Sequence, residues 1–340
     1  MSRNKPFIIA EMSGNHNHSL ELALKIVDAA AEAGADALKL QTYTADTMTI
    51  DLAEGDFYIS DPKNLWYGET LYSLYQKAST PWEWHNAIFD RCRERGIQGF
   101  STPFDATAVD FLEDLNVPMY KISGFENGDI PLLKKVASTR KPVIMSLGLI
   151  GPDEMEEAIG TLLDNGCPDL TILKCTNSYP ASPEAINLLT IPDLKRRFPS
   201  CRVGLSDHSL GIGVAIAAVT LGAEVIEKHF TLCRKDGGVD SAFSLEPAEM
   251  KQLVEETARA ALACGKVCYD LSEEEKKSIQ GRRSVYVTED IKAGEVFTAR
   301  NLRCIRPGYG CHPRYYEQLL GKTALRDLRR GTPMKLEYAE

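Results

Sequence analysis

The chain lacks the long hydrophobic runs and the excess of positive charge that mark membrane proteins and nucleic-acid-binding proteins. No stretch approaches the roughly 20 consecutive apolar residues of a membrane-spanning helix. The N-terminal segment MSRNKPFIIAEM has too short an apolar core for a signal peptide. The formal net charge of −9 disfavours nonspecific attraction to nucleic acid or to anionic lipid. We therefore expect a cytoplasmic protein that binds neither nucleic acid nor membrane.

Two further signatures are missing. The 9 cysteines form no regularly spaced framework, and an odd number without an export signal is typical of reduced thiols. No G-x-G-x-x-G motif follows the first strand-like run, which disfavours a dinucleotide-binding sheet. The 340 residues, 44% hydrophobic and 26% charged, have the composition of a soluble globular enzyme with room for one large domain and one small domain.

Strand-like and helix-like segments alternate through most of the chain. The strand-like runs are short, apolar and bounded by polar residues or glycine, as buried parallel strands are. They are PFIIAEM, ALKLQTY, QGFSTPF, MYKISGF, PVIMSLG, LTILKCTN, RVGLSDH and EVIEKHFTL. Helix starts are predicted at Pro152 and Pro183, and at Pro81 with Thr80 as the N-cap and Glu83 reciprocating. Eight such units in about 260 residues predict a (β/α)₈ TIM barrel, with a doubly wound open sheet as the alternative.

Two regions depart from this alternation. The connection over residues 45–79 is oversized, and long loops after barrel strands often carry substrate recognition. It contains Trp66 and several tyrosines, which would either stack on a ligand or simply pack the loop. Beyond the barrel, a charged stretch leads into short strand signals and turns. We expect a barrel domain over 1–265, a linker over 266–281 and a small mixed domain over 282–340, which at that size needs support from something larger.

Two histidines end two consecutive strand-like runs. They are His208 in VGLSDHS and His229 in VIEKHFTL, with the helix-like GIGVAIAAVTLG between them. Neighbouring strands of a parallel barrel deliver their ends to one mouth, so the two imidazoles are a candidate site for a borderline divalent metal. The alternative is a pair of unrelated histidines, one in a loop and one capping a strand.

The other strand ends are also polar. Alternate residues of a strand share a face, so Lys39 and Gln41 can both line a pocket, and so can Ser206 and His208. Lys228 and His229 are adjacent, so Lys228 points away from the pocket if His229 points into it. Several lysines around one mouth of an acidic protein indicate an anion site. A metal, lysines and carboxylates together suit a phosphorylated, carboxylated substrate and a carbonyl group that must be polarised.

Seven ordered motifs and the tail IRPGYGCHP together resemble the sialic acid synthase family over essentially the whole chain. The motifs are AEMSGNHNHS, LKLQTYTADTM, FSTPFD, YKISGFE, LKCTNSYP, GLSDHSLG and IEKHFTL. The resemblance implies a barrel followed by a C-terminal β-clip, the antifreeze-like SAF domain. It also implies a metal-assisted, aldol-like condensation of phosphoenolpyruvate with an open-chain N-acetylated amino sugar, which gives a nine-carbon α-keto acid and phosphate.

The same resemblance implies roles for individual residues. His208 and His229 would hold a divalent ion, Mn²⁺ or else Mg²⁺ or Co²⁺, and Glu11 would be the acid–base group beside it. Phosphoenolpyruvate would be held by Lys39, Thr102, Lys121, Asn177 and Ser206. The sugar would contact Gln41, Glu126, Tyr179 and Asp240. Arg306 would reach the sugar in the partner subunit of a domain-swapped homodimer.

The chain departs from the family pattern near its fourth strand. Where family members often have a serine two places before the glutamate, this chain has Gly124, with Ser123 one place earlier. Either the Ser123 hydroxyl or the Gly124 backbone N–H is then left to contact phosphoenolpyruvate. We also find no clear counterpart of the family's sugar-binding asparagine in the loop over 45–79.

The identity of the sugar is the main open question. WYGETLYSLYQKASTPWEWH and FENGD resemble the branch of the family whose sugar is 2,4-diacetamido-2,4,6-trideoxy-L-altrose. The alternative keeps the chemistry and changes the sugar to N-acetylmannosamine or the legionaminic acid precursor. A remote alternative is a non-catalytic carbohydrate-binding protein, although simple sugar binding requires neither a histidine pair nor pocket lysines.

Overall fold

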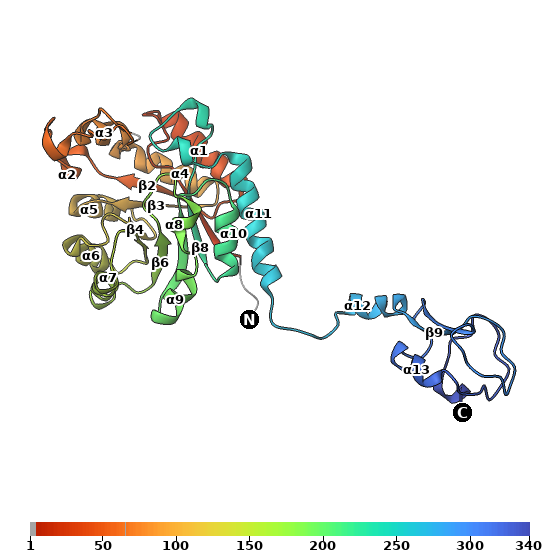
Figure 1. Cartoon of the computed structure of the whole chain (residues 1–340). Helices are drawn as coiled ribbons and strands as arrows, with labels where there is room; N and C mark the ends of the chain where they lie inside the picture. Colours follow the sequence, from red (N-terminus) through yellow and green to blue (C-terminus); the bar gives the residue numbers. More distant parts are fainter. Residues whose placement is uncertain (1–4, 65) are drawn as a thin grey trace. The chain divides into compact units, whose positions relative to one another are not determined.

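Eight parallel strands close into a barrel in the first of two units into which the chain divides (Figure 1). The computed structural model describes residues 5–64 and 66–340. The strands follow one another in sequence order, and the first pairs with the eighth to close the ring. They are β1 (Phe7–Glu11), β2 (Ala37–Thr42), β3 (Gln98–Pro103), β4 (Tyr120–Ile122), β5 (Val143–Leu147), β6 (Leu170–Cys175), β7 (Arg202–Asp207) and β8 (Val225–His229). The predicted barrel is confirmed, and the open-sheet alternative is wrong.

Helices surround the strands, as Figure 1 shows. They are α1 (Leu20–Ala33), α2 (Ala45–Met48), α3 (Leu71–Ala78), α4 (His85–Glu94), α5 (Ala106–Asp114), α6 (Ile130–Ser138), α7 (Pro152–Asp164), α8 (Pro183–Ile186), α9 (Thr190–Arg197), α10 (Gly213–Thr220) and α11 (Pro247–Cys264). The last helix packs on α1 and α10 with one buried face formed by Met250, Leu253, Thr257 and Ala261. The large core lies between the strands and these helices.

The predicted helix starts had two outcomes. Helices α7 and α8 begin at Pro152 and Pro183, as expected. The capping role predicted for Thr80 is wrong, since only a 3₁₀ turn without a side-chain cap follows it, at Trp82–Trp84. The Thr80 hydroxyl instead lies 3.0 Å from Nε2 of His16, a buried residue of the loop after β1. A long-range partner has therefore taken the oxygen that a local cap would use.

The interior of the barrel is closed by an apolar layer. Its members are Ile9, Ala37, Phe100, Ile144, Leu173 and Val225, one from each of six strands. Because side chains alternate along a strand, the residue two places further on each strand also faces inward, one layer closer to the carboxyl ends. The apolar layer therefore forms the bottom of any pocket at the carboxyl ends of the strands.

The second unit comprises Lys266–Glu340. Its elements are the short helix α12 (Glu273–Ser278), the antiparallel strands β9 (Ser284–Val287) and β10 (Leu302–Ile305), and α13 (Tyr316–Leu319). It has its own small core of buried side chains, including Val285, Phe297 and Leu302. The stretch 266–281, predicted to be a linker, includes α12, which begins with a Ser272 capping box.

All nine cysteines are free thiols. Among the residues that the structure describes, no helix has the length and apolarity needed to cross a membrane.

Candidate active site

The inner-facing residues at the carboxyl ends of the strands are polar and buried. Glu11 follows Ile9 of the apolar layer by two places on β1, and Glu227 and His229 follow Val225 by two and four on β8. Glu11 and His229 are register partners where the barrel closes. Strand alternation therefore places a polar layer directly above the apolar one. We call the buried set Glu11, Lys39, Lys121 and Glu227 the floor of the site.

Opposite charges alternate across this floor. The Lys39 ammonium lies 3.0 Å from Oε2 of Glu11 and 3.6 Å from Oε1 of Glu227. The Lys121 ammonium lies 3.9 Å from the same oxygen of Glu227 and donates to the Ser146 hydroxyl at 2.7 Å. All of these side chains are buried, so their charges must be balanced within the site. Glu11 and Glu227 balance Lys39, and Glu227 is shared with Lys121.

Burial and these partners set the protonation of the floor. Burial raises the pKa of Glu11 to about 7, although Lys39 opposes the shift. Burial acts on Glu227 in the same direction, but Lys121 and Lys39 outweigh it and lower the pKa of that carboxyl. Burial lowers the pKa of Lys121, whereas for Lys39 the two carboxylates outweigh burial and raise the pKa. The floor thus combines a firmly charged Lys39–Glu227 pair with a more weakly held proton at Lys121.

The two imidazoles do meet at the mouth. The ring centroids of His208 and His229 are 5.4 Å apart. Nδ1 of His208 lies 2.9 Å from the carbonyl oxygen of Thr176, so this nitrogen donates and Nε2 keeps its lone pair. Nδ1 of His229 is buried and has no hydrogen-bond partner among the described residues, and Oδ2 of Asp240 lies 3.8 Å away.

These donors fit a divalent ion held by two imidazoles. The lone pair of His208 and the unpartnered nitrogen of His229 are the groups that a borderline metal prefers. Within residues 5–64 and 66–340, no group of three or more His, Cys, Asp and Glu residues lies together in a metal-binding arrangement. An ion held by this pair would need water or substrate oxygens to complete its ligands.

A cavity of about 450 Å³ opens above the floor. The barrel strands supply its polar side. The connection after β2 supplies an apolar side, with Met48, Ile59, Leu71 and Leu74 among its lining residues. The oversized loop over 45–79 therefore forms one wall of the site, and it carries α2, α3 and a short 3₁₀ turn at Gly55–Phe57.

Most of the residues singled out in the sequence line this cavity. They are Glu11, Lys39, Gln41, Lys121, Ser123, Glu126, Asn177, Tyr179, Ser206, His208, His229 and Asp240. Thr102 is not in the lining, but its hydroxyl accepts a hydrogen bond of 3.2 Å from Lys39. Arg306 belongs to the second unit, where it is exposed. The structure places these residues, and their individual roles stay predictions.

Two predicted sugar contacts are engaged with hydroxyl groups. Ser123 donates to the Glu126 carboxylate, and Ser13 donates to the Asp240 carboxylate. Burial raises the pKa of Asp240 to about 6, against the opposing effect of Ser13. Since the Ser123 hydroxyl has a partner and Gly124 also lines the cavity, the backbone N–H of Gly124 is the freer of the two candidate donors.

Two glycines make room for Asn177. A Cβ at Gly148 would lie 1.7 Å from Oδ1 of Asn177, and a Cβ at Gly124 would lie 2.6 Å from the same atom. Neither distance is sterically possible, so the amide occupies space that only glycine leaves open. The backbone at the ends of β4 and β5 thereby determines where Asn177 points.

Several residues of the site had no role assigned to them from the sequence. Glu227 is the most important, since it lies between the two floor lysines. The alternation that assigned Lys39 and Gln41 to one face would also have assigned Glu227 and His229 to one face. Ser13, Ser146 and Cys175 also line the cavity. In the loop, Asn64 and Trp66 line it as well, and no local pattern distinguishes them from packing residues.

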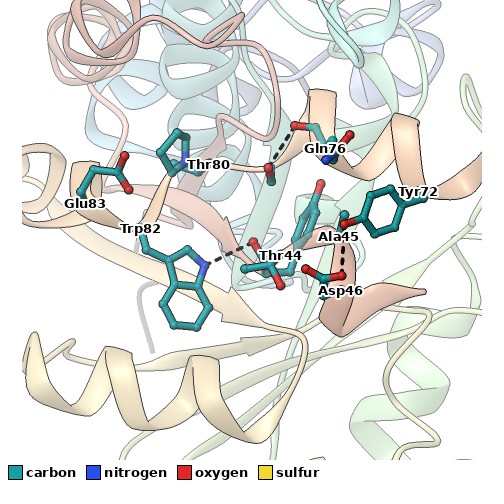
Figure 2. A pocket seen from close by; sticks show the side chains of 11 residues that line it. Thr44, Ala45, Asp46, Tyr72, Gln76, Thr80, Trp82 and Glu83 are labelled. Atoms are coloured by element: carbon teal, nitrogen blue, oxygen red, sulfur yellow. Dashed lines mark hydrogen bonds between the residues drawn. The ribbon is translucent and has the colours of Figure 1, made fainter. Parts of the chain in front are cut away.

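A second cavity of about 480 Å³ lies at the base of the loop (Figure 2). Its lining includes Tyr43, Asp46, Tyr72, Trp82 and Glu83. The Trp82 indole donates to the carbonyl of Tyr43 at 3.2 Å, and the Tyr72 hydroxyl donates to Asp46 at 3.1 Å. These hydrogen bonds anchor the loop to the segment that follows β2, and the lining contains no lysine or histidine.

The fold and the floor define the class of protein. A closed barrel in which lysines, carboxylates and imidazoles converge at the carboxyl ends of the strands has the architecture of a (β/α)₈ enzyme. A model of the NeuB family matches residues 26–269, and a model of the SAF domain matches residues 282–337. The chain belongs to the NeuB family.

Individual relatives agree with this membership. A pseudaminic acid synthase of Campylobacter jejuni is 43% identical over 331 residues, which cover 97% of this chain and 96% of that protein. An N,N'-diacetyllegionaminic acid synthase of the same organism is 37% identical and covers 96% and 97%. A solved N-acetylneuraminic acid synthetase from Leptospira borgpetersenii, in complex with citrate, has a TM-score of 0.72 and 32% identity over 82% of this chain and 91% of that chain.

Proposed function

We propose that this chain is a pseudaminic acid synthase. It would condense phosphoenolpyruvate with 2,4-diacetamido-2,4,6-trideoxy-L-altrose. Carbon 3 of phosphoenolpyruvate forms a bond to the aldehyde carbon, water adds at carbon 2, and the C–O bond to phosphate breaks. The products are pseudaminic acid and inorganic phosphate. The observation that carries the proposal is the buried lysine–carboxylate floor beneath two imidazoles, in a chain 43% identical to a pseudaminic acid synthase.

Phosphoenolpyruvate belongs at the floor because its charge is the most negative. Lys39 and Lys121 are the cations there, and Asn177 and Ser206 add neutral polar groups. A lysine that has already lost solvent on folding interacts more strongly with a phosphate or carboxylate than an exposed lysine would. Thr102 contributes through Lys39, whose ammonium it holds at 3.2 Å.

We infer that His208 and His229 hold a divalent ion, Mn²⁺ by preference. Such an ion would polarise the aldehyde oxygen of the sugar and stabilise the negative charge that develops there. Glu11, on the strand that pairs with β8, is the candidate acid–base group, since Gln41 and Lys39 both orient its carboxylate. The proton that the sugar oxygen gains would pass through this carboxyl group.

The sugar belongs between the floor and the loop. Gln41, Glu126, Tyr179 and Asp240 line that part of the cavity and offer both donors and acceptors. We further propose that Arg306 completes the sugar site of a partner subunit in a domain-swapped homodimer. Its guanidinium makes no hydrogen bond or ion pair within the described part of the chain, which leaves it available for such a contact. The resemblance to nonulosonic acid synthases leads us to propose that the reaction takes place in the cytoplasm.

Phosphate release tests the proposal against its alternatives. The protein is supplied with Mn²⁺, phosphoenolpyruvate and one sugar at a time. Release with the diacetamido-altrose supports a pseudaminic acid synthase. Comparable turnover of N-acetylmannosamine or of the legionaminic precursor would move the assignment to an N-acetylneuraminate or legionaminic acid synthase, and no release with any sugar would favour a carbohydrate-binding protein.

A further inference from the structure

The indole N–H of Trp66 is a buried donor without a partner in the wall of the active-site cavity. Its Nε1 atom is shielded from solvent and makes no hydrogen bond to any residue that the structure describes. The backbone around it is well held, because the Trp66 amide donates to Oδ1 of Asn64 at 3.0 Å and the Glu69 amide donates to the Trp66 carbonyl at 3.2 Å. The loop therefore fixes this residue while leaving its side-chain donor unused.

Such a donor is unusual in a folded protein. An indole nitrogen donates and cannot accept, and leaving a buried donor unpaired destabilises the fold. Trp82, elsewhere in the same connection, satisfies its N–H with the carbonyl of Tyr43 at 3.2 Å. Since Trp66 lines the cavity and Trp82 does not, a ligand in the cavity is the natural acceptor for Trp66.

The surroundings restrict what that acceptor can be. The loop side of the cavity is mostly apolar, with Met48, Ile59, Leu71 and Leu74 beside the uncharged polar side chains of Asn64 and Tyr75, whereas the cations Lys39 and Lys121 lie on the floor. A phosphate or carboxylate beside the loop would lose water without gaining a positive partner. A neutral carbonyl that carries a methyl group matches both the single donor and the apolar side chains, and an acetamido group has this composition.

We propose that Trp66 is a specificity-determining residue that donates its indole N–H to an acetamido carbonyl of the sugar. The apolar side chains of the loop receive the acetamido methyl group. This inference rests on the proposed function, because it takes the sugar to be acetamido-substituted. It assigns the loop over 45–79 the task of selecting the sugar, while the floor binds the cosubstrate that all nonulosonic acid synthases would share.

The test is the binding of an unreactive sugar to Trp66→Phe. Phenylalanine keeps an aromatic ring and removes the N–H. Calorimetric titration with the alditol of the diacetamido-altrose, in the presence of phosphoenolpyruvate, should show roughly three- to tenfold weaker binding, as expected for one lost neutral hydrogen bond. The Kd of phosphoenolpyruvate should stay the same. Trp84→Phe is the matched control, since Trp84 packs against His16 outside the cavity, and it should bind the alditol like the wild type.

Two analogues that carry a single acetamido group, at carbon 2 or at carbon 4, identify the acceptor. The penalty of Trp66→Phe should persist for one analogue and vanish for the other. Equal affinity of Trp66→Phe and the wild type for the diacetamido alditol would overturn the inference, as would equal penalties for both analogues. Phosphate release by the wild type, measured in parallel, reports separately on the proposed function.

Discussion

Asp207 and Lys228 form a fully buried ion pair, with the Lys228 ammonium 2.8 Å from Oδ2 of Asp207. Each residue directly precedes one of the two imidazoles, His208 after β7 and His229 at the end of β8. Because alternate residues face opposite sides, the pair lies behind the wall of the cavity while the imidazoles face into it. The ion pair thereby ties together the two strands that present the candidate metal ligands.

Lys228→Met should strongly destabilise the protein. The substitution leaves the Asp207 carboxylate buried without its cation, and breaking a buried pair in this way costs about 3–5 kcal/mol. Thermal unfolding measures the loss. The control is Arg202→Met on β7, the strand of Asp207, where the half-exposed pair with Asp169 should contribute little. Equal midpoints for the two variants would contradict a structural role for the buried pair.

Gly148→Ala should weaken the use of phosphoenolpyruvate with little effect on the fold. The new Cβ would lie 1.7 Å from Oδ1 of Asn177 and would push that amide out of position. If Asn177 contacts the charged cosubstrate, about 10- to 100-fold should be lost in kcat/KM for phosphoenolpyruvate. Steady-state kinetics and a thermal midpoint are the measurements. Gly160→Ala, in α7 with open space around it, should leave the kinetics unchanged. Unchanged kinetics of Gly148→Ala would remove Asn177 from the binding site.

His229→Ala should abolish both turnover and metal binding. We expect phosphate release to fall by at least about 100-fold, because the remaining imidazole cannot hold the ion alone. Titration of Mn²⁺ into the protein gives a second readout that does not require turnover. His18→Ala alters an exposed histidine outside the cavity and should bind Mn²⁺ normally. Normal Mn²⁺ binding by His229→Ala would remove this residue from the metal site.

The role of Arg306 can be tested by mixing subunits. Neither Arg306→Ala nor His229→Ala alone should be fully active. If Arg306 acts in the partner's site, a mixed dimer contains one barrel with an intact His229 and an intact Arg306 from the other chain. Co-refolding or co-expression of the two variants should then restore phosphate release to roughly a quarter of the wild-type level or more. No restoration in a verified mixed dimer would mean that Arg306 acts within its own chain or not at all.

His16 and His85 should lower the stability of the fold as the pH drops from 7 to 5, whereas the raised pKa values of Glu11 and Asp240 act in the opposite direction. Burial lowers the pKa of His16 to about 4, with His18 and His85 adding to the shift, and burial lowers the pKa of His85 to about 4. An unfolded histidine titrates near 6.5, so between pH 6.5 and 4 the unfolded chain binds more protons and gains stability relative to the native state. Each histidine should contribute a loss of about 2 kcal/mol between pH 7 and pH 5.

His16→Gln and His85→Gln separate this contribution from other titrations. Each variant should have a thermal midpoint that depends less steeply on pH than that of the wild type, whatever its midpoint at pH 7. Each imidazole forms a hydrogen bond with a hydroxyl group. His16 is paired with Thr80, and His85 is paired with Thr42 of β2. An unchanged pH slope in both variants would show that neither imidazole is forced to stay neutral by its surroundings.

The barrel was predictable because its signals are local and repeated. The short apolar runs and the helix starts at Pro152 and Pro183 depend only on residues that are neighbours in the sequence, so they could be recognised without the fold. Strand alternation was likewise enough to assign Lys39 and Gln41 to the cavity. Applied to β8, the same alternation would have found Glu227. The failures came from long-range contacts. The Thr80 hydroxyl bonds His16 from another segment, and whether Trp66 packs or binds depends on a cavity that only the folded chain creates.

The account depends on sugar-dependent release of phosphate from phosphoenolpyruvate. The most direct measurement follows phosphate and product mass together, with the wild-type protein, Mn²⁺ and 2,4-diacetamido-2,4,6-trideoxy-L-altrose. The account predicts one phosphate released for each molecule of a nine-carbon α-keto acid formed, and no release when the sugar is omitted. Phosphate release that does not depend on the sugar, or no release at all, would contradict it.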